Sequence, residues 1–176
     1  MIRILTAIIL LSACGSSESK TFCATPCGAF IAAANGTPQY PCSDYRKIES
    51  FLILELSDKI PNACSRLSGL TAWELPGFST RLGGTLGGKE SWASGWAECA
   101  NRKVMFHTGN GYMFVDDYER KRNTWNTAFT HELVHAAQNC ESPMPVDPGR
   151  DPSHSNWSRD GLEKSIFNVI ERMEKE

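Results

Sequence analysis

The sequence has only four histidines, no repeat, no apolar run of membrane-spanning length and no excess of charge of either sign. A helix that crosses a bilayer needs roughly 20 apolar residues, so no transmembrane segment is expected. The formal net charge is -2, which argues against nucleic-acid binding because phosphate recognition needs a basic face. At 176 residues the chain is long enough for one sizeable core, and we expect a single domain over residues 21–176.

Phosphate-binding motifs are also absent. The glycine-rich stretch from Pro76 to Gly95 contains Gly83-Gly84 and Gly87-Gly88, but it follows neither the G-x-G-x-x-G pattern nor the P-loop pattern. We predict a long loop over this stretch, which could border an active site.

The first residues have the form of an export signal. A positive start, Met1 to Arg3, precedes a short apolar run, Ile4 to Leu11, and this order is typical of a signal peptide over residues 1–13. The stretch Leu11-Ser12-Ala13-Cys14 resembles the lipobox of bacterial lipoproteins, in which the chain is cut before the cysteine and the cysteine is lipidated. The alternative is an ordinary secretory signal with an incidental Cys14.

The lipobox resemblance implies a location for the protein. Acyl chains on Cys14 would hold the mature chain on a membrane, with the polar residues 14–20 as a tether. Gly15 follows the cysteine where retention in the inner membrane uses aspartate. The resemblance therefore implies the cell envelope, and the outer membrane if the source is Gram-negative.

Besides Cys14, the sequence contains six cysteines. An even number in an exported chain predicts three disulfides, with fifteen possible connectivities. A zinc site is the weaker alternative, because only one closely spaced pair exists. A bond between Cys99 and Cys140, pinning sheet to helix, is a guess. The six are Cys23, Cys27, Cys42, Cys64, Cys99 and Cys140.

The strongest motif is His131-Glu132-Leu133-Val134-His135, which reads H-E-x-x-H. On a helix the two histidines lie one turn apart, so both imidazoles can bind one Zn²⁺, while Glu132 can act on water without being a ligand. The alternative is a chance match, which the scarcity of histidine makes less frequent. The motif resembles that of zincin metallopeptidases, a resemblance that implies an α+β fold with a small antiparallel or mixed sheet, an active-site helix and a C-terminal helix.

A catalytic zinc site needs a third protein ligand. His154 is our first candidate, and Asp147, Asp151 and Glu163 are the others; a surface histidine is the alternative for His154. The spacing from His135 is similar to that of the third ligand in gluzincins, although gluzincins use glutamate there. The metzincin pattern does not continue, because Gln138 and Glu141 stand where it has glycine and histidine.

The periodicity around the motif predicts the surrounding elements. Trp125, Phe129, Leu133 and Ala136 or Ala137 form an apolar stripe that leaves the two motif histidines off the core side. Asn123 is the expected cap of this helix, Cys140 its end, and Asp160 the expected cap of the last helix. A helix with Ser43 as cap carries a second stripe; its residues are Tyr45, Ile48, Leu52 and Leu56, with Asp44, Arg46, Lys47 and Glu49 expected on the solvated face.

We also predict a short helix near Phe30 to Ala34, a strand from Leu67 to Leu75, and a hairpin before the metal helix. The hairpin would join Arg102–His107 to Tyr112–Val115 through an Asn-Gly turn. In zincins an edge strand above the active-site helix pairs with the substrate backbone. His107 could be a ligand or a transition-state donor, although a histidine at a strand end is more often exposed.

The first hypothesis is therefore a zinc-dependent endopeptidase, monomeric and lipid-anchored in the cell envelope, that acts on peptide or protein substrates. Glu132 would be the general base. Tyr112, Tyr118 or Arg150 could stabilise an oxyanion, and Asp151 or Asp160 could orient a ligand. The second hypothesis is a non-catalytic lipoprotein that binds a partner and carries a structural or relict zinc. A third differs only in substrate, with cell-wall peptides in place of protein.

Overall fold

The computed structural model describes residues 23–77, 80–86, 89–109, 111–115, 119–139, 157 and 160–176. The predicted signal peptide, Cys14 and the predicted tether lie outside these residues and stay predictions. Among the helices in the described ranges, none combines the length and the apolar character needed to cross a membrane.

A five-stranded mixed sheet forms one layer of the fold, with strand order β1-β2-β3-β7-β6. The three middle strands run parallel, and each edge strand runs antiparallel to its neighbour. The strands are β1 (Cys23–Ala24), β2 (Phe30–Ala33), β3 (Thr71–Leu75), β7 (Lys103–His107) and β6 (Gly95–Glu98). The predicted α+β class with a small mixed sheet is confirmed.

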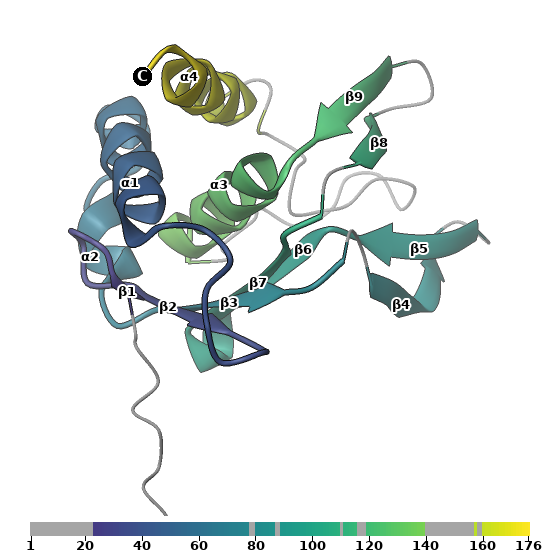
Figure 1. The fold of residues 1–176 in the computed structure, drawn as a ribbon. Coiled ribbons are helices and arrows are strands. Elements are labelled where there is room, and N and C mark those ends of the chain that lie inside the picture. Colours follow the sequence, from purple (N-terminus) through teal and green to yellow (C-terminus); the bar gives the residue numbers. More distant parts are fainter. Residues whose placement is uncertain are drawn as a thin grey trace, which may run out of the picture.

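The main helices cover one side of this sheet (Figure 1). Helix α3 packs directly on β7 and β6, and α4 packs on α1 and α3, on the side away from the sheet. The core between the layers contains the buried side chains of Ile31, Leu52, Val104, Phe106 and Leu133. The helices of the described residues are α1 (Cys42–Leu56), α2 (Ala63–Leu67), α3 (Trp125–Ala137) and α4 (Leu162–Lys175), with one 3-10 turn, η1 (Cys99–Asn101).

Two separate hairpins lie beside the sheet, β4 (Thr80–Leu86) with β5 (Lys89–Ala93), and β8 (Gly111–Val115) with β9 (Glu119–Asn123). The loop predicted over the glycine-rich stretch is therefore wrong. The predicted pairing of residues 102–107 with residues 112–115 is also wrong. Strand β7 is buried along most of its length and takes β3 and β6 as partners, because the backbone groups of a buried strand need hydrogen-bond partners on both edges.

The apolar stripe of α1 is confirmed, since Tyr45, Ile48, Leu52 and Leu56 are all buried. Glu49 was expected on the solvated face, and this is wrong: its side chain is fully buried. Its carboxylate accepts hydrogen bonds from Thr25 Oγ1 at 2.6 Å and from the Cys27 backbone N–H at 2.7 Å. These donors from the preceding loop offset the cost of removing the carboxylate from water.

Several predicted boundaries are corrected. The short helix near Phe30 is strand β2, because pairing with β3 buries Ile31 to Ala33. The strand predicted from Leu67 begins only at Thr71, after α2. Helix ends also differ: the N-cap positions are Pro41, Thr124 and Gly161 in place of Ser43, Asn123 and Asp160, and α3 ends at Ala137, before Cys140.

Within the described residues, two disulfides tie β1 and the loop after it to helices α1 and α2. Cys23 is bonded to Cys42 and Cys27 to Cys64, with Cα atoms 5.5 Å and 5.1 Å apart. The first connects β1 with the start of α1, and the second connects the loop after β1 with α2. The suggested bond from Cys99 to Cys140 involves a residue outside the described part of the chain and stays a guess.

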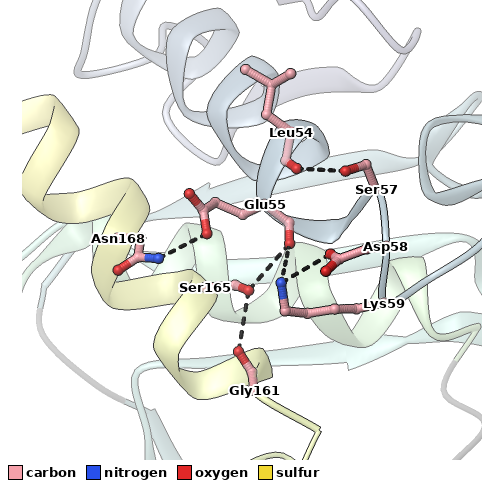
Figure 2. Close-up of polar contacts among 8 residues, drawn as sticks. All are labelled: Leu54, Glu55, Ser57, Asp58, Lys59, Gly161, Ser165 and Asn168. Carbon is pink, nitrogen blue, oxygen red and sulfur yellow. Dashed lines mark hydrogen bonds and ion pairs between the residues drawn. The ribbon is translucent and has the colours of Figure 1, made fainter.

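Helix α4 is attached to the end of α1 by polar contacts around Glu55, drawn in Figure 2. The Asn168 amide donates to the Glu55 carboxylate at 2.8 Å. Ser165 Oγ lies 3.4 Å from the Glu55 carbonyl oxygen, which also accepts a bond from Lys59 Nζ at 2.7 Å. These contacts fix the N-terminal half of α4, the part that follows the candidate site in sequence.

Candidate metal centre

Helix α3 carries the H-E-x-x-H motif and is held by its apolar stripe. Trp125, Phe129 and Leu133 are buried in the core, as predicted. Phe129 packs on Phe106 of β7, with ring centroids 4.9 Å apart, and on Tyr45 of α1, with centroids 5.2 Å apart. The helix is thus fixed from the sheet and from α1, and its rotation determines where the motif side chains lie.

The two motif histidines meet on one face of α3. Their Nε2 atoms are 3.2 Å apart; His135 is buried and His131 half-buried. Two nitrogens bound to one tetrahedral Zn²⁺ at about 2.0–2.1 Å lie about 3.3 Å from each other. The separation of the Nε2 atoms therefore suits a shared zinc ion, and neutral imidazole is a ligand that zinc favours.

Glu132 lies on a different flank of α3 and faces the edge strand β6. Its side chain is 4% exposed. A Cβ atom built on Gly95 would lie 2.6 Å from the Oε1 atom of Glu132 and 2.7 Å from its Cγ atom. Only glycine therefore leaves room for this carboxylate against the strand. The general base that the motif predicts thus lies at the boundary between α3 and the edge strand.

A buried polar pair lies next to α3. The Tyr45 ring packs edge-on against Trp125 and Phe129 of α3, and its hydroxyl donates a hydrogen bond to the carboxylate of Glu74 on β3. Burial, and then Glu74, raises the pKa of Tyr45, so the phenol stays protonated and remains a donor. Glu74 also accepts a bond from the Gln39 backbone N–H at 2.7 Å.

Trp157 lies against both histidines. Its ring centroid is 4.7 Å from that of His131 and 4.5 Å from that of His135. Its indole N–H donates to the Gln138 side chain at 2.8 Å, and its carbonyl oxygen accepts a bond from the Leu162 N–H at 2.9 Å. This residue therefore connects the end of α3, the histidine pair and the start of α4.

The described residues include no group of three or more His, Cys, Asp or Glu side chains placed to hold a metal. Glu163, in the first turn of α4, therefore does not join the histidine pair. His154, Asp147 and Asp151 lie outside the described residues, as do Tyr118, Arg150 and the side chain of Tyr112. Asp160 is exposed.

His107 is not exposed, which corrects the expectation for a strand end. Its side chain is 5% exposed, and its Nδ1 lies 3.0 Å from the Pro76 carbonyl oxygen. Its backbone N–H donates to the Ser94 carbonyl oxygen at 2.8 Å. His107 thus joins the end of β7 to the segments before β4 and β6.

Sequence reasoning gave no role in this region to Gly95, Gln138 and Trp157, although Trp157 lies close in sequence to the candidate ligand His154. Gln138 follows His131 by seven residues and His135 by three, so helical periodicity places all three on one face. That spacing could have pointed to Gln138. No sequence signal indicates that Gly95 meets Glu132, because their contact joins distant parts of the chain.

Comparisons with known proteins give no relative. No protein-family model matches the sequence, and no curated protein or solved structure matches the chain.

Proposed function

We propose that this chain is a zinc-dependent endopeptidase of the zincin type. The observation that carries the proposal is the 3.2 Å separation of the His131 and His135 Nε2 atoms on a helix whose Glu132 lies against an edge strand. When bound, Zn²⁺ lowers the pKa of water towards about 7 and polarises a carbonyl group. The residues of this chain would supply the remaining steps.

His131 and His135 would hold the metal through Nε2. The Glu132 carboxylate would take a proton from the attacking water and pass it to the nitrogen of the cleaved peptide bond. Its packing against Gly95 supports this role, because a carboxylate held in a fixed position needs little rearrangement before it accepts the proton.

Strand β6 would orient the substrate. It is the last strand in the sheet order, runs antiparallel to β7 and packs on α3. An edge strand has unpaired backbone groups that can bond an extended peptide. A peptide paired with β6 would pass the side of α3 on which Glu132 lies.

His154 is the proposed third ligand. Trp157 lies against both histidine rings, and three residues of chain span at most about 11 Å. The short separation in sequence between residue 154 and Trp157 supports His154 as the ligand. Lipid anchoring through Cys14 in the cell envelope, with a peptide or protein substrate, completes the proposal.

The test measures zinc content by mass spectrometry and hydrolysis of denatured casein, both on the purified full chain. We expect about one zinc per chain in the wild type, loss of zinc in His131→Ala and His154→Ala, and retained zinc in Glu132→Gln. Hydrolysis by Glu132→Gln should fall at least about a hundredfold. His107→Gln, which changes the other described histidine, is the matched control and should keep its zinc.

Turnover retained by zinc-loaded Glu132→Gln would refute the mechanism. A folded wild type that binds zinc but cleaves no peptide, whether from protein or from cell wall, would favour the partner-binding lipoprotein.

A further inference from the structure

Trp157 is fixed at two points by hydrogen bonds. The side chain is 5% exposed. Its indole N–H donates to Gln138 Oε1 at 2.8 Å, and its backbone carbonyl accepts the Leu162 N–H at 2.9 Å. One bond ties it to α3 and the other to α4, so the ring has a defined place between the two helices.

Gln138 presents its acceptor from a rigid position. Its backbone N–H donates to the Val134 carbonyl at 2.9 Å, continuing the hydrogen bonding of α3 by one residue. Residues 131, 135 and 138 fall on one helix face, at spacings of four and three. The same rigid element therefore presents the two imidazoles and the acceptor for Trp157.

The indole ring limits the orientations open to both imidazoles. The planes of the indole and imidazole rings are inclined by 49° for His131 and by 41° for His135, at centroid distances of 4.7 Å and 4.5 Å. An imidazole binds metal only when its nitrogen lone pair points at the ion, and groups that fix the ring raise metal affinity. Packing by Trp157 would supply that constraint for both rings at once.

We propose that Trp157, held by its hydrogen bond to Gln138, is a positioning residue of the metal site that orients His131 and His135. The inference rests on the proposed function, because it assumes that these histidines bind zinc. Trp157 and Gln138 contribute no metal ligand in this role. Loss of the hydrogen bond should weaken metal binding while both histidines remain in place.

The experiment is a double-mutant cycle on zinc affinity, measured by competition with a chelator on the full chain. Trp157→Phe removes the N–H donor and keeps an aromatic ring; Gln138→Leu removes the acceptor and keeps the size. We expect about a tenfold loss of affinity in each single variant. The double variant should be no weaker than the weaker single variant, because both remove one hydrogen bond.

Two further variants separate positioning from general loss of structure. Gln138→Glu keeps an acceptor oxygen at the same reach and should bind zinc at least as tightly as the wild type. Trp73→Phe makes the same change in a half-buried tryptophan of β3, which lies under Lys103 Nζ, and should leave the zinc affinity unchanged.

Each outcome decides the proposal. Unchanged affinity in both single variants, independent effects that multiply in the double variant, or a Gln138→Glu affinity as low as that of Gln138→Leu would each overturn it, with the proposed function intact. A wild type that binds no zinc would overturn the proposed function and this inference together.

Discussion

Glu49 of α1 and Glu132 of α3 are both buried carboxylates, and their surroundings differ. Glu49 is fully buried and accepts bonds from the Thr25 hydroxyl and the Cys27 N–H, donors fixed in the loop after β1. Glu132 is 4% exposed and lies against Gly95, where the strand has no side chain. The Glu49 carboxylate is bonded by two donors of one loop, and the Glu132 carboxylate fills the space that a side chain at position 95 would take.

The two surroundings favour different roles for a buried glutamate. Fixed donors around Glu49 join the stapled N-terminal loop to α1, which is a structural role. The Glu132 carboxylate occupies the space that a side chain at position 95 would fill, so its position depends on the glycine of the neighbouring strand. The contacts of Glu49 indicate a structural role, whereas the proposed function gives Glu132 a chemical one, and three changes test this contrast.

The largest effect is expected from Glu49→Ala. It leaves the buried Thr25 hydroxyl and the half-buried Cys27 N–H without their acceptor and creates a cavity, which together should lower the free energy of unfolding by about 3 kcal/mol. Urea unfolding measures this free energy. The control is Glu171→Ala, which removes an exposed ion pair with Lys175 and should change the free energy of unfolding little. Zinc binding by the folded fraction should be unaffected; a loss of zinc at unchanged stability would contradict the structural role.

A smaller effect is expected from Gly95→Ala. The added methyl group would press on the Glu132 carboxylate and should lower casein hydrolysis about tenfold through a shift of order 1 Å, with zinc content unchanged. In the Glu132→Gln background the same change should cost nothing further. An equal loss in both backgrounds would show that Gly95 acts through strand packing and not through Glu132.

The smallest effect concerns pH. Desolvation by burial raises the pKa of Glu49 above its ordinary value of 4.5, although its two hydrogen bonds oppose the shift. The folded state therefore holds this proton more tightly than the unfolded state, and the resulting stability is present below about pH 4.5 and lost as pH rises through the folded pKa.

Glu49→Gln cannot titrate, so the stability of the wild type relative to this variant should decrease between pH 4 and pH 7. Urea unfolding of both proteins across this range measures the difference. A constant or increasing difference would refute the raised pKa.

Periodicity along the sequence correctly predicted the features that depend on helix geometry alone. The stripes of α1 and α3 were correct because helical spacing alone places Tyr45 or Phe129 on the buried side. The motif spacing likewise placed His131 and His135 on one face of α3.

The same reasoning failed for contacts between residues that are far apart in the sequence. Glu49 looked solvated because its donors, Thr25 and Cys27, are more than twenty residues away. The Asn-Gly turn predicted a β7–β8 hairpin, yet β7 pairs with β3, from which the 27 residues 76–102 separate it. Contacts of this kind, including that of Gly95 with Glu132, depend on which elements pack together, and single-sequence periodicity does not encode that.

Both described disulfides lie within residues 23–64, whereas the candidate metal ligands of the described residues lie on α3. The disulfides and the metal would therefore stabilise the fold under different solution conditions. Cross-links that close loops of this size restrict the unfolded chain and contribute about 3–4 kcal/mol each in the chain-entropy model. That contribution follows the redox potential of the surroundings. A metal held by α3, as proposed, would stabilise the fold in proportion to the logarithm of free zinc. Because α3 packs on the disulfide-linked helices α1 and α2, a thiol reductant and a chelator should each lower the free energy of unfolding of the same domain.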